Sequence, residues 1–149
     1  MTAPTARPRY LVDHSVMSHY WLDPTVRAKI DQLASVGTLC SSMVTMDEAR
    51  FSARSMEDLA FVTDLYSKAF FWLPFDEDAE GKVADIRAAL WKIGAGRGAQ
   101  TTDVLIAATA IRHDAVIVHN DTDFLTLHRA VPELNQLRIV PSTHSDAGS

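Results

Sequence analysis

Short apolar runs alternate along this chain with longer stretches in which apolar residues recur at helical spacing. The short runs are rich in β-branched, leucine or aromatic residues, and each is followed by a polar residue or a proline. They lie at residues 9–12, 38–41, 70–73, 115–118 and 137–140. Runs of this length and composition are typical of strands that are buried on both faces of a parallel sheet.

The stretches between these runs predict helices. They cover residues 16–21, 25–35, a segment through 48 to about 52, 56–69, about 76–93, 103–113 and 125–131. Strands that alternate with helices predict a three-layer α/β/α sandwich with a mostly parallel central sheet. The length of 149 residues fits a single domain over 1–149, and we expect 1–8 and 142–149 to be flexible tails.

Three polar residues or groups are candidates to cap these helices. Ser15 can cap the first helix, and Asp76 with its two acidic neighbours can cap the long helix after residue 76. Thr101 or Thr102 can cap the helix that begins near residue 103. These are the residue types preferred at helix N-termini, because their side-chain oxygens accept hydrogen bonds from free backbone N–H groups.

The helix 103–113 and the strand that follows it bring acidic residues to one edge of the sheet. Both elements are roughly 16 Å long at about 1.5 Å and about 3.3 Å per residue, so the chain returns to the edge from which it left. Asp103 therefore shares this edge with Asp121 and Asp123, which follow the strand. Asp13 follows the first strand, and active sites of such sheets lie beyond the carboxyl ends of the strands.

Each candidate acid also has a purely structural interpretation. Asp13 can be a turn or cap residue, and Asp121 with Asp123 can form an Asx-turn cluster. Asp103 suits the first turn of a helix because of the helix dipole, and Thr45-Met46-Asp47-Glu48 matches a capping box. Electrostatic repulsion favours a common functional site over these separate structural roles. Like charges about 4 Å apart cost on the order of 4 kcal/mol at an effective dielectric near 20. Converging carboxylates therefore require a cation or raised pKa values.

Composition and charge narrow the class of protein. The net charge is −5, from 14 Lys and Arg against 19 Asp and Glu, which argues against nucleic-acid binding through overall charge alone. The single cysteine, Cys40, excludes a disulfide framework and a cysteine zinc site. No apolar run reaches the length of a membrane span, and residues 1–8 lack the apolar segment of a signal peptide. We expect a soluble cytoplasmic protein with no membrane partner.

Two weaker signals lie outside the acidic cluster. Gly94-Ala95-Gly96-Arg97-Gly98 follows a helix and lacks the last glycine of a dinucleotide loop, so cofactor binding there is not expected. Several arginines near the expected rim or the ends of its helices have either a phosphate-binding role or a solvated surface role: Arg50, Arg54, Arg97 and Arg112.

A group of carboxylates without cysteine or paired histidine ligands suits Mg²⁺ or Mn²⁺. Such an ion can lower the pKa of a bound water and neutralise charge on a phosphodiester. The residues therefore indicate a nuclease. An aspartyl-phosphate phosphatase is a second enzymatic hypothesis, but it would need another acid at Ser15, two residues after Asp13.

Four segments together resemble the motifs of PIN-domain proteins, in particular VapC-type toxins. They are Leu11-Val12-Asp13-His14-Ser15-Val16, the segment around Glu48, Thr102-Asp103-Val104-Leu105-Ile106-Ala107-Ala108-Thr109-Ala110 and Val118-His119-Asn120-Asp121-Thr122-Asp123-Phe124. The resemblance spans about residues 9–140. Many relatives have Thr or Ser directly after the first Asp, whereas His14 stands there in this chain and leaves Ser15 as the nearest hydroxyl.

The resemblance implies a Mg²⁺- or Mn²⁺-dependent endoribonuclease that acts on structured RNA such as tRNA or rRNA. It also implies inhibition by a VapB-type antitoxin and assembly as a homodimer. Asp13, Glu48, Asp103 and Asp121 would form the acidic catalytic set, in which Asp13, Asp103 and Asp121 bind the metal. Asp123 would be a supporting or alternate ligand. A non-enzymatic alternative is a PIN-like module that binds RNA or protein with little or no catalysis.

Overall fold

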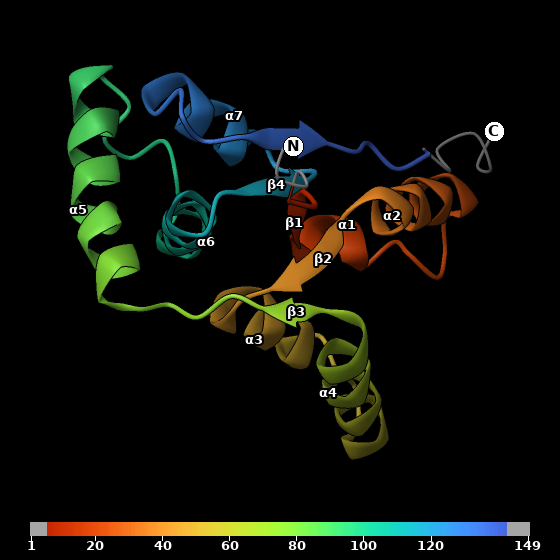
Figure 1. The fold of residues 1–149 in the computed structure, drawn as a ribbon. Helices are drawn as coiled ribbons and strands as arrows, with labels where there is room; N and C mark the ends of the chain where they lie inside the picture. The colour runs from red at the N-terminus through yellow and green to blue at the C-terminus, as the bar shows by residue number, and fades with distance from the viewer. Residues whose placement is uncertain (1–5, 143–149) are drawn as a thin grey trace, which may run out of the picture.

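One parallel sheet forms the centre of the protein. The structure is a computed structural model in which residues 6–142 are described. The strands are β1 (Arg9–Val12), β2 (Thr38–Ser41), β3 (Phe71–Trp72), β4 (Ala115–His119) and β5 (Gln136–Arg138). Their order across the sheet is β3-β2-β1-β4-β5 (Figure 1), and each neighbouring pair among the described residues is parallel.

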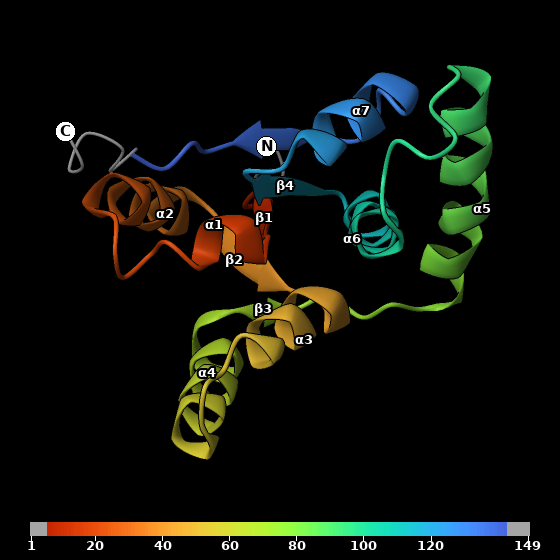
Figure 2. The ribbon, with the colours of Figure 1, turned by 180° about the vertical axis from the view of Figure 1, so that it is seen from behind.

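Helices cover both faces of this sheet. They are α1 (His14–Met17), α2 (Pro24–Val36), α3 (Met43–Phe51), α4 (Met56–Ala69), α5 (Glu77–Lys92), α6 (Thr101–Arg112) and α7 (Thr122–Ala130). In Figures 1 and 2, α5, α6 and α7 lie on one side of the sheet, α1 and α2 lie on the other, and α3 and α4 lie beside the β3 edge. The predicted three-layer α/β/α sandwich is confirmed.

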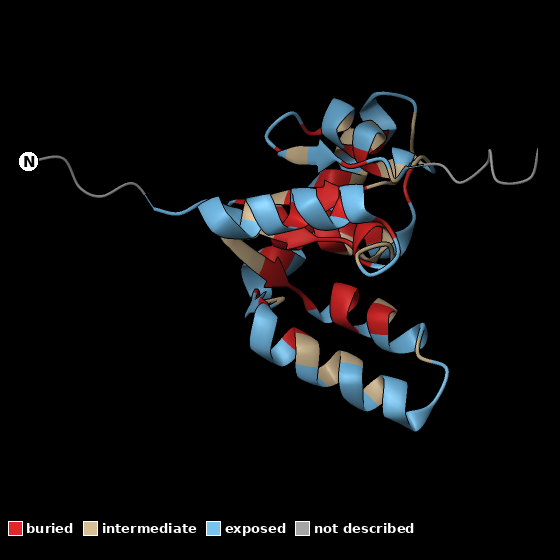
Figure 3. Ribbon diagram, turned by 90° about the vertical axis from the view of Figure 1, so that its right-hand side faces the viewer, coloured by how far each residue is buried: buried red, intermediate tan, exposed pale blue. Residues whose placement is uncertain are grey.

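Successive residues of the central strands supply two separate cores. Leu11 and Ile117 point into a cluster with α5, α6 and α7. Val12 and Val118 point the other way, into a cluster with α1, α2 and α4. This is the period-two alternation of a strand buried on both faces. Figure 3 shows buried residues concentrated on the sheet and on the helix faces turned toward it.

The structure corrects the expected beginnings of two helices. The first helix begins at His14, and its cap is Asp13, not Ser15, because the Asp13 carboxylate accepts the Ser15 N–H. Helix α6 has Gln100 at its N-cap with no side-chain hydrogen bond, so neither Thr101 nor Thr102 caps it.

Two other helix boundaries depend on aspartates. Helix α7 begins at Thr122, three residues earlier than expected, because Asp121 caps it through a hydrogen bond from the Asp123 N–H to Asp121. The predicted cap of α5 is confirmed, since the Asp76 carboxylate accepts from the Ala79 N–H at 2.9 Å.

The expected tails fall mostly outside the described residues, which exclude 1–5 and 143–149. At the inner end of the first, Arg7 donates to the Gly37 carbonyl at 2.9 Å. At the inner end of the second, the Ser142 N–H donates to the Asp23 carboxylate at 2.6 Å. Within residues 6–142, no helix has the length and apolar character needed to cross a membrane.

Candidate metal centre

Three carboxylates meet at the carboxyl edge of the sheet. Asp103 lies in the first turn of α6 and is only 7% exposed, while Asp121 and Asp123 lie half-buried at the start of α7. One carboxylate oxygen from each of the three lies within 4.8 Å of the others. The predicted return of the chain to this edge is therefore correct.

This proximity changes the acidity of Asp103. Burial, a hydrogen bond with Asp123 and the nearby charges of Asp121, Asp123 and Asp13 together raise the pKa of Asp103 to about 8. The largest of these causes is burial, which disfavours the ionised form. Without a cation, the cluster therefore holds a proton at neutral pH, and a divalent ion would offset the same repulsion.

Asp13 lies beside this cluster at the end of the central strand. Its N–H continues the β1–β4 pairing by donating to the Val118 carbonyl at 2.8 Å, and its side chain is only 3% exposed. Oδ2 accepts from the Ser15 N–H at 3.2 Å and from the Ser15 hydroxyl at 2.5 Å. Oδ1 is buried and has no hydrogen-bond partner among the described residues. A buried polar atom without a partner is rare, and this oxygen is free for an outside ligand.

Ser15 joins the first and last acidic segments. Its hydroxyl donates to Asp13 and accepts from the Asn120 N–H at 2.9 Å. It therefore supplies the hydroxyl partner of Asp13 that His14 leaves open in the sequence. The Asn120 side chain is fixed in turn by a 3.1 Å hydrogen bond from Arg138.

Glu48 lies on α3 and faces the same region. The alternative interpretation, a capping box of Thr45 and Glu48, is wrong. The helix starts earlier, with Ser42 as N-cap, and the reciprocal bonds join Ser42 and Thr45. The Glu48 carboxylate is therefore not used in capping. Burial and the charges of Asp13 and Asp121 raise its pKa to about 7, whereas Asp47 is exposed, as expected.

Comparison with known proteins identifies the family. The sequence-family model for the PIN domain matches residues 10–130 of this chain. This chain belongs to the PIN-domain family. It is similar to ribonuclease VapC21 of Mycobacterium tuberculosis, with 31% identity over 116 residues, or 78% of this chain and 83% of the relative. Ribonuclease VapC51 of the same organism is 29% identical over 78% of this chain and 82% of its own length.

Solved structures share the PIN-domain fold at lower sequence identity. VapBC2 from Rickettsia felis, bound to a DNA fragment from its promoter, gives a TM-score of 0.74 at 17% identity and covers 89% of this chain and 99% of that chain. DNA-bound VapBC from Salmonella typhimurium gives 0.70 at 22% identity, covering 88% and 98%.

A buried histidine that the sequence pattern did not single out supports the acidic edge of this PIN domain. His119 ends β4, and its Nδ1 accepts from the Asp121 N–H at 3.1 Å. Its Nε2 lies 2.7 Å from Oε1 of Gln136. The two contacts assign the proton to Nε2, and burial lowers the pKa of the ring. The signal in the sequence was its place in the inward-facing series Ala115, Ile117, His119.

The PIN domain also buries a tyrosine hydroxyl close to its acids. Tyr66 of α4 stacks on Phe70 with 4.6 Å between ring centroids, and its hydroxyl has no hydrogen-bond partner among residues 6–142. Burial and the charges of Asp13 and Glu48 raise its pKa. The hydroxyl therefore remains protonated and is available as a donor.

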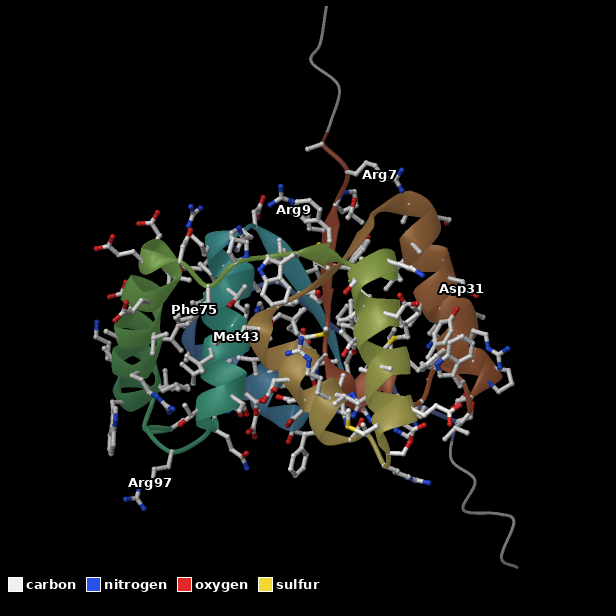
Figure 4. The ribbon with its side chains drawn as sticks, turned by 90° about the horizontal axis from the view of Figure 1, so that it is seen from below. Arg7, Arg9, Asp31, Met43, Phe75 and Arg97 are labelled. Carbon is white, nitrogen blue, oxygen red and sulfur yellow. The ribbon has the colours of Figure 1, made fainter. Side chains whose placement is uncertain are left out.

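Two of the candidate phosphate-binding arginines, Arg112 and Arg97, lie in different parts of this PIN domain. Arg112 lies at the end of α6 far from Asp103 and pairs with Asp76 at 3.0 Å, so it does not serve the acidic edge. Arg97 is exposed in the loop that leads to α6, and Figure 4 shows it at the opposite end of the molecule from Arg9, which begins β1.

Proposed function

We propose that this protein is a metal-dependent endoribonuclease and the toxin of a toxin–antitoxin pair. The observation that carries this proposal is the meeting of Asp103, Asp121 and Asp123 within 4.8 Å, beside the unpartnered Oδ1 of Asp13. Membership in the PIN-domain family and the similarity to ribonucleases named VapC support the reaction class.

The residues present fit a divalent cation. The cluster offers only carboxylate oxygens, which suit Mg²⁺ or Mn²⁺. Burial, a hydrogen bond with Asp123 and the neighbouring negative charges raise the pKa of Asp103, and a cation would offset the charge. In this proposal Asp13, Asp103 and Asp121 hold the ion, Asp123 supports or replaces one of them, and Glu48 binds directly or through a water. A bound ion would lower the pKa of a coordinated water and offset charge on the phosphodiester.

The protein's own groups prepare this site before substrate arrives. Ser15 fixes the Asp13 carboxylate through Oδ2, while Oδ1 has no hydrogen-bond partner among the described residues and would accept the ion. His119 fixes the backbone of Asp121, whose side chain is also held by the Asp123 N–H. In the metal-free protein, burial and the charges of Asp13 and Asp121 raise the pKa of Glu48 to about 7, and a bound cation would favour its ionised form.

We also propose the partners that this assignment implies. The structural neighbours are described as VapBC complexes, so we assign this chain a VapB-type antitoxin. Its substrate would be structured RNA such as tRNA or rRNA, its working form a homodimer and its compartment the cytoplasm. Isolation of the chain together with the product of a neighbouring short gene would test the antitoxin.

Cleavage of purified RNA by the full-length protein tests the activity. We expect cleavage with Mg²⁺ or Mn²⁺, loss of cleavage with a chelator, and loss of at least two orders of magnitude in Asp13→Asn and Asp103→Asn, each with an unchanged circular dichroism spectrum. Asp85→Asn on the exposed face of α5 is the matched control and should cleave normally. Metal binding without any cleavage would favour the non-catalytic module, and full activity in Asp103→Asn would contradict the assignment.

A further inference from the structure

A surface hollow of about 610 Å³ lies beside the acidic edge, between α3 and the start of α6. Met43, Asp47 and Phe51 line it and follow one another at four-residue spacing, so they share one face of α3. Figure 4 shows Met43 on this helix near the centre of the molecule. The other face of α3 packs Met46 and Ala49 into the core. The face that lines the hollow is therefore not needed to hold the helix.

The hollow adjoins the acidic edge. Glu48 lines it, and the charges of Asp13 and Asp121 act on this carboxylate. Thr102, which directly precedes Asp103, and His14, which directly follows Asp13, also line it. A ligand that fills the hollow therefore lies next to the residues that carry the carboxylates. Its volume falls within the roughly 300–1,000 Å³ of typical ligand pockets.

Phe51 presents an aromatic ring at the mouth of this hollow. It is the last residue of α3 and is 93% exposed, more than any other large apolar residue described. The fold gains almost nothing from burying this ring. Met43, which is half exposed, lines the same hollow, and exposed apolar side chains that gather around a concave surface are typical of ligand-binding grooves.

Arg50 adds a positive charge at the same place. It lines the hollow, is exposed, and makes no ion pair or side-chain hydrogen bond among the described residues. An aromatic ring beside a free guanidinium is the combination that binds unpaired nucleotides: bases stack on the ring and the arginine contacts phosphate.

We propose that this hollow binds one unpaired nucleotide of the RNA next to the cleaved phosphodiester, with its base stacked on Phe51 and its phosphate paired with Arg50. The proposal rests on the proposed nuclease function, which places the scissile phosphate at the carboxylates. Asp47 offers an acceptor for the amino group of a base. A peptide would gain from the apolar wall, but it would not need the adjoining phosphodiester site or Arg50.

Fluorescence of 2-aminopurine tests the stacking directly. The probe is a single-stranded RNA octamer with 2-aminopurine at each position in turn, mixed with the full chain carrying Asp103→Asn to prevent cleavage. We expect quenching at one or two adjacent positions. Phe51→Leu, which keeps apolar bulk but lacks the ring, should abolish this quenching and raise Kd about tenfold. Phe51→Tyr should keep the quenching and the Kd of the protein with Phe51.

Two further variants complete the test. Phe71→Ala removes an exposed ring on the edge strand β3, which contacts Arg9 and does not line the hollow. It should change neither the quenching nor Kd. Arg50→Ala should lower the slope of log Kd against log salt concentration by about 1. Retained quenching in Phe51→Leu would overturn the proposal, as would an effect of that variant only on binding of a VapB-type peptide.

Kinetics separate this inference from the proposed function. In the otherwise native chain, Phe51→Leu should raise KM for RNA about tenfold and leave kcat within twofold. If Asp13→Asn abolishes cleavage but Phe51→Leu leaves KM unchanged, the nucleotide site is wrong and the nuclease stands. If the native chain cleaves no RNA, the nuclease is wrong, and the fluorescence result alone decides the hollow.

Discussion

Replacing Asp103 with asparagine should make the metal-free protein more stable. Burial and neighbouring acids raise the pKa of Asp103 from 3.8 to about 8, so its ionised form is disfavoured in the folded state. Between about pH 4 and about pH 8 the folded protein holds a proton that the unfolded chain releases. The contribution of Asp103 to the free energy of unfolding is therefore most favourable at low pH, and it becomes less favourable as the pH rises toward the pKa of the folded state. Asparagine removes that loss.

The magnitude follows from the size of the shift. A rise of about 4 pH units corresponds to at most about 6 kcal/mol at about 1.4 kcal/mol per unit. Asp121 and Asp123 remain partly open to water, which screens the repulsion. We expect a gain of about 1–2 kcal/mol, similar to other substitutions that relieve strained functional sites. In a chain of this length it raises Tm by about 2–8 °C.

Thermal unfolding with a chelator at about pH 4.5 and about pH 8.5 measures this effect. The difference in Tm between Asp103→Asn and the native chain should widen from the lower to the higher pH. Asp85→Asn on exposed α5 should show no such change. A variant that is equally stable or less stable than the native chain at the higher pH would refute the electrostatic argument.

Three further predictions concern residues outside the proposed metal ligands, namely His119, Gly81 and Gly37. His119→Ala should destabilise the protein by about 2–4 kcal/mol and weaken Mn²⁺ binding roughly 10–100-fold, because the Asp121 N–H loses its acceptor. His119→Asn can restore an acceptor near the position of Nδ1 and should recover much of the Mn²⁺ affinity in calorimetric titration. Equal Mn²⁺ affinity in the two variants would contradict this role of His119. Gly81→Ala should raise stability by about 0.5–1 kcal/mol, since an added Cβ meets nothing within 4 Å inside α5. Gly37→Ala should lower the free energy of unfolding by about 1–3 kcal/mol, because its Cβ would lie 2.5 Å from the Pro8 carbonyl and from the Tyr10 ring. Both glycine predictions would be refuted if denaturant unfolding showed Gly37→Ala to be more stable than Gly81→Ala.

The apolar pattern was sufficient to predict the layers of the fold and the edge at which the acids gather. Both follow from periodicity and from the lengths of helix 103–113 and the next strand, which are local properties. Local signals failed where several residues compete for one role. Ser42, not Thr45, caps α3, because β2 ends at Ser41 and the helix begins directly after it.

Other features of the site depend on contacts between distant parts of the chain. The sequence pattern does not give the strand order β3-β2-β1-β4-β5. The role of His119 requires Gln136 on the neighbouring strand as well as Asp121. The hollow beside α3 also requires Thr102 of α6. These features arise from tertiary packing, which hydrophobic periodicity does not encode.

The central position of β1 affects when the protein can become active during its synthesis. Residues 9–12 are made first, but one of their two neighbouring strands is residues 115–119, and the bond from Asn120 to Ser15 spans 105 residues. A nascent chain of 100 residues therefore has neither the second neighbour of β1 nor three of the five acids. Under the proposed function, cleavage can therefore begin only after residues 115–123 have left the ribosome and β4 has paired with β1.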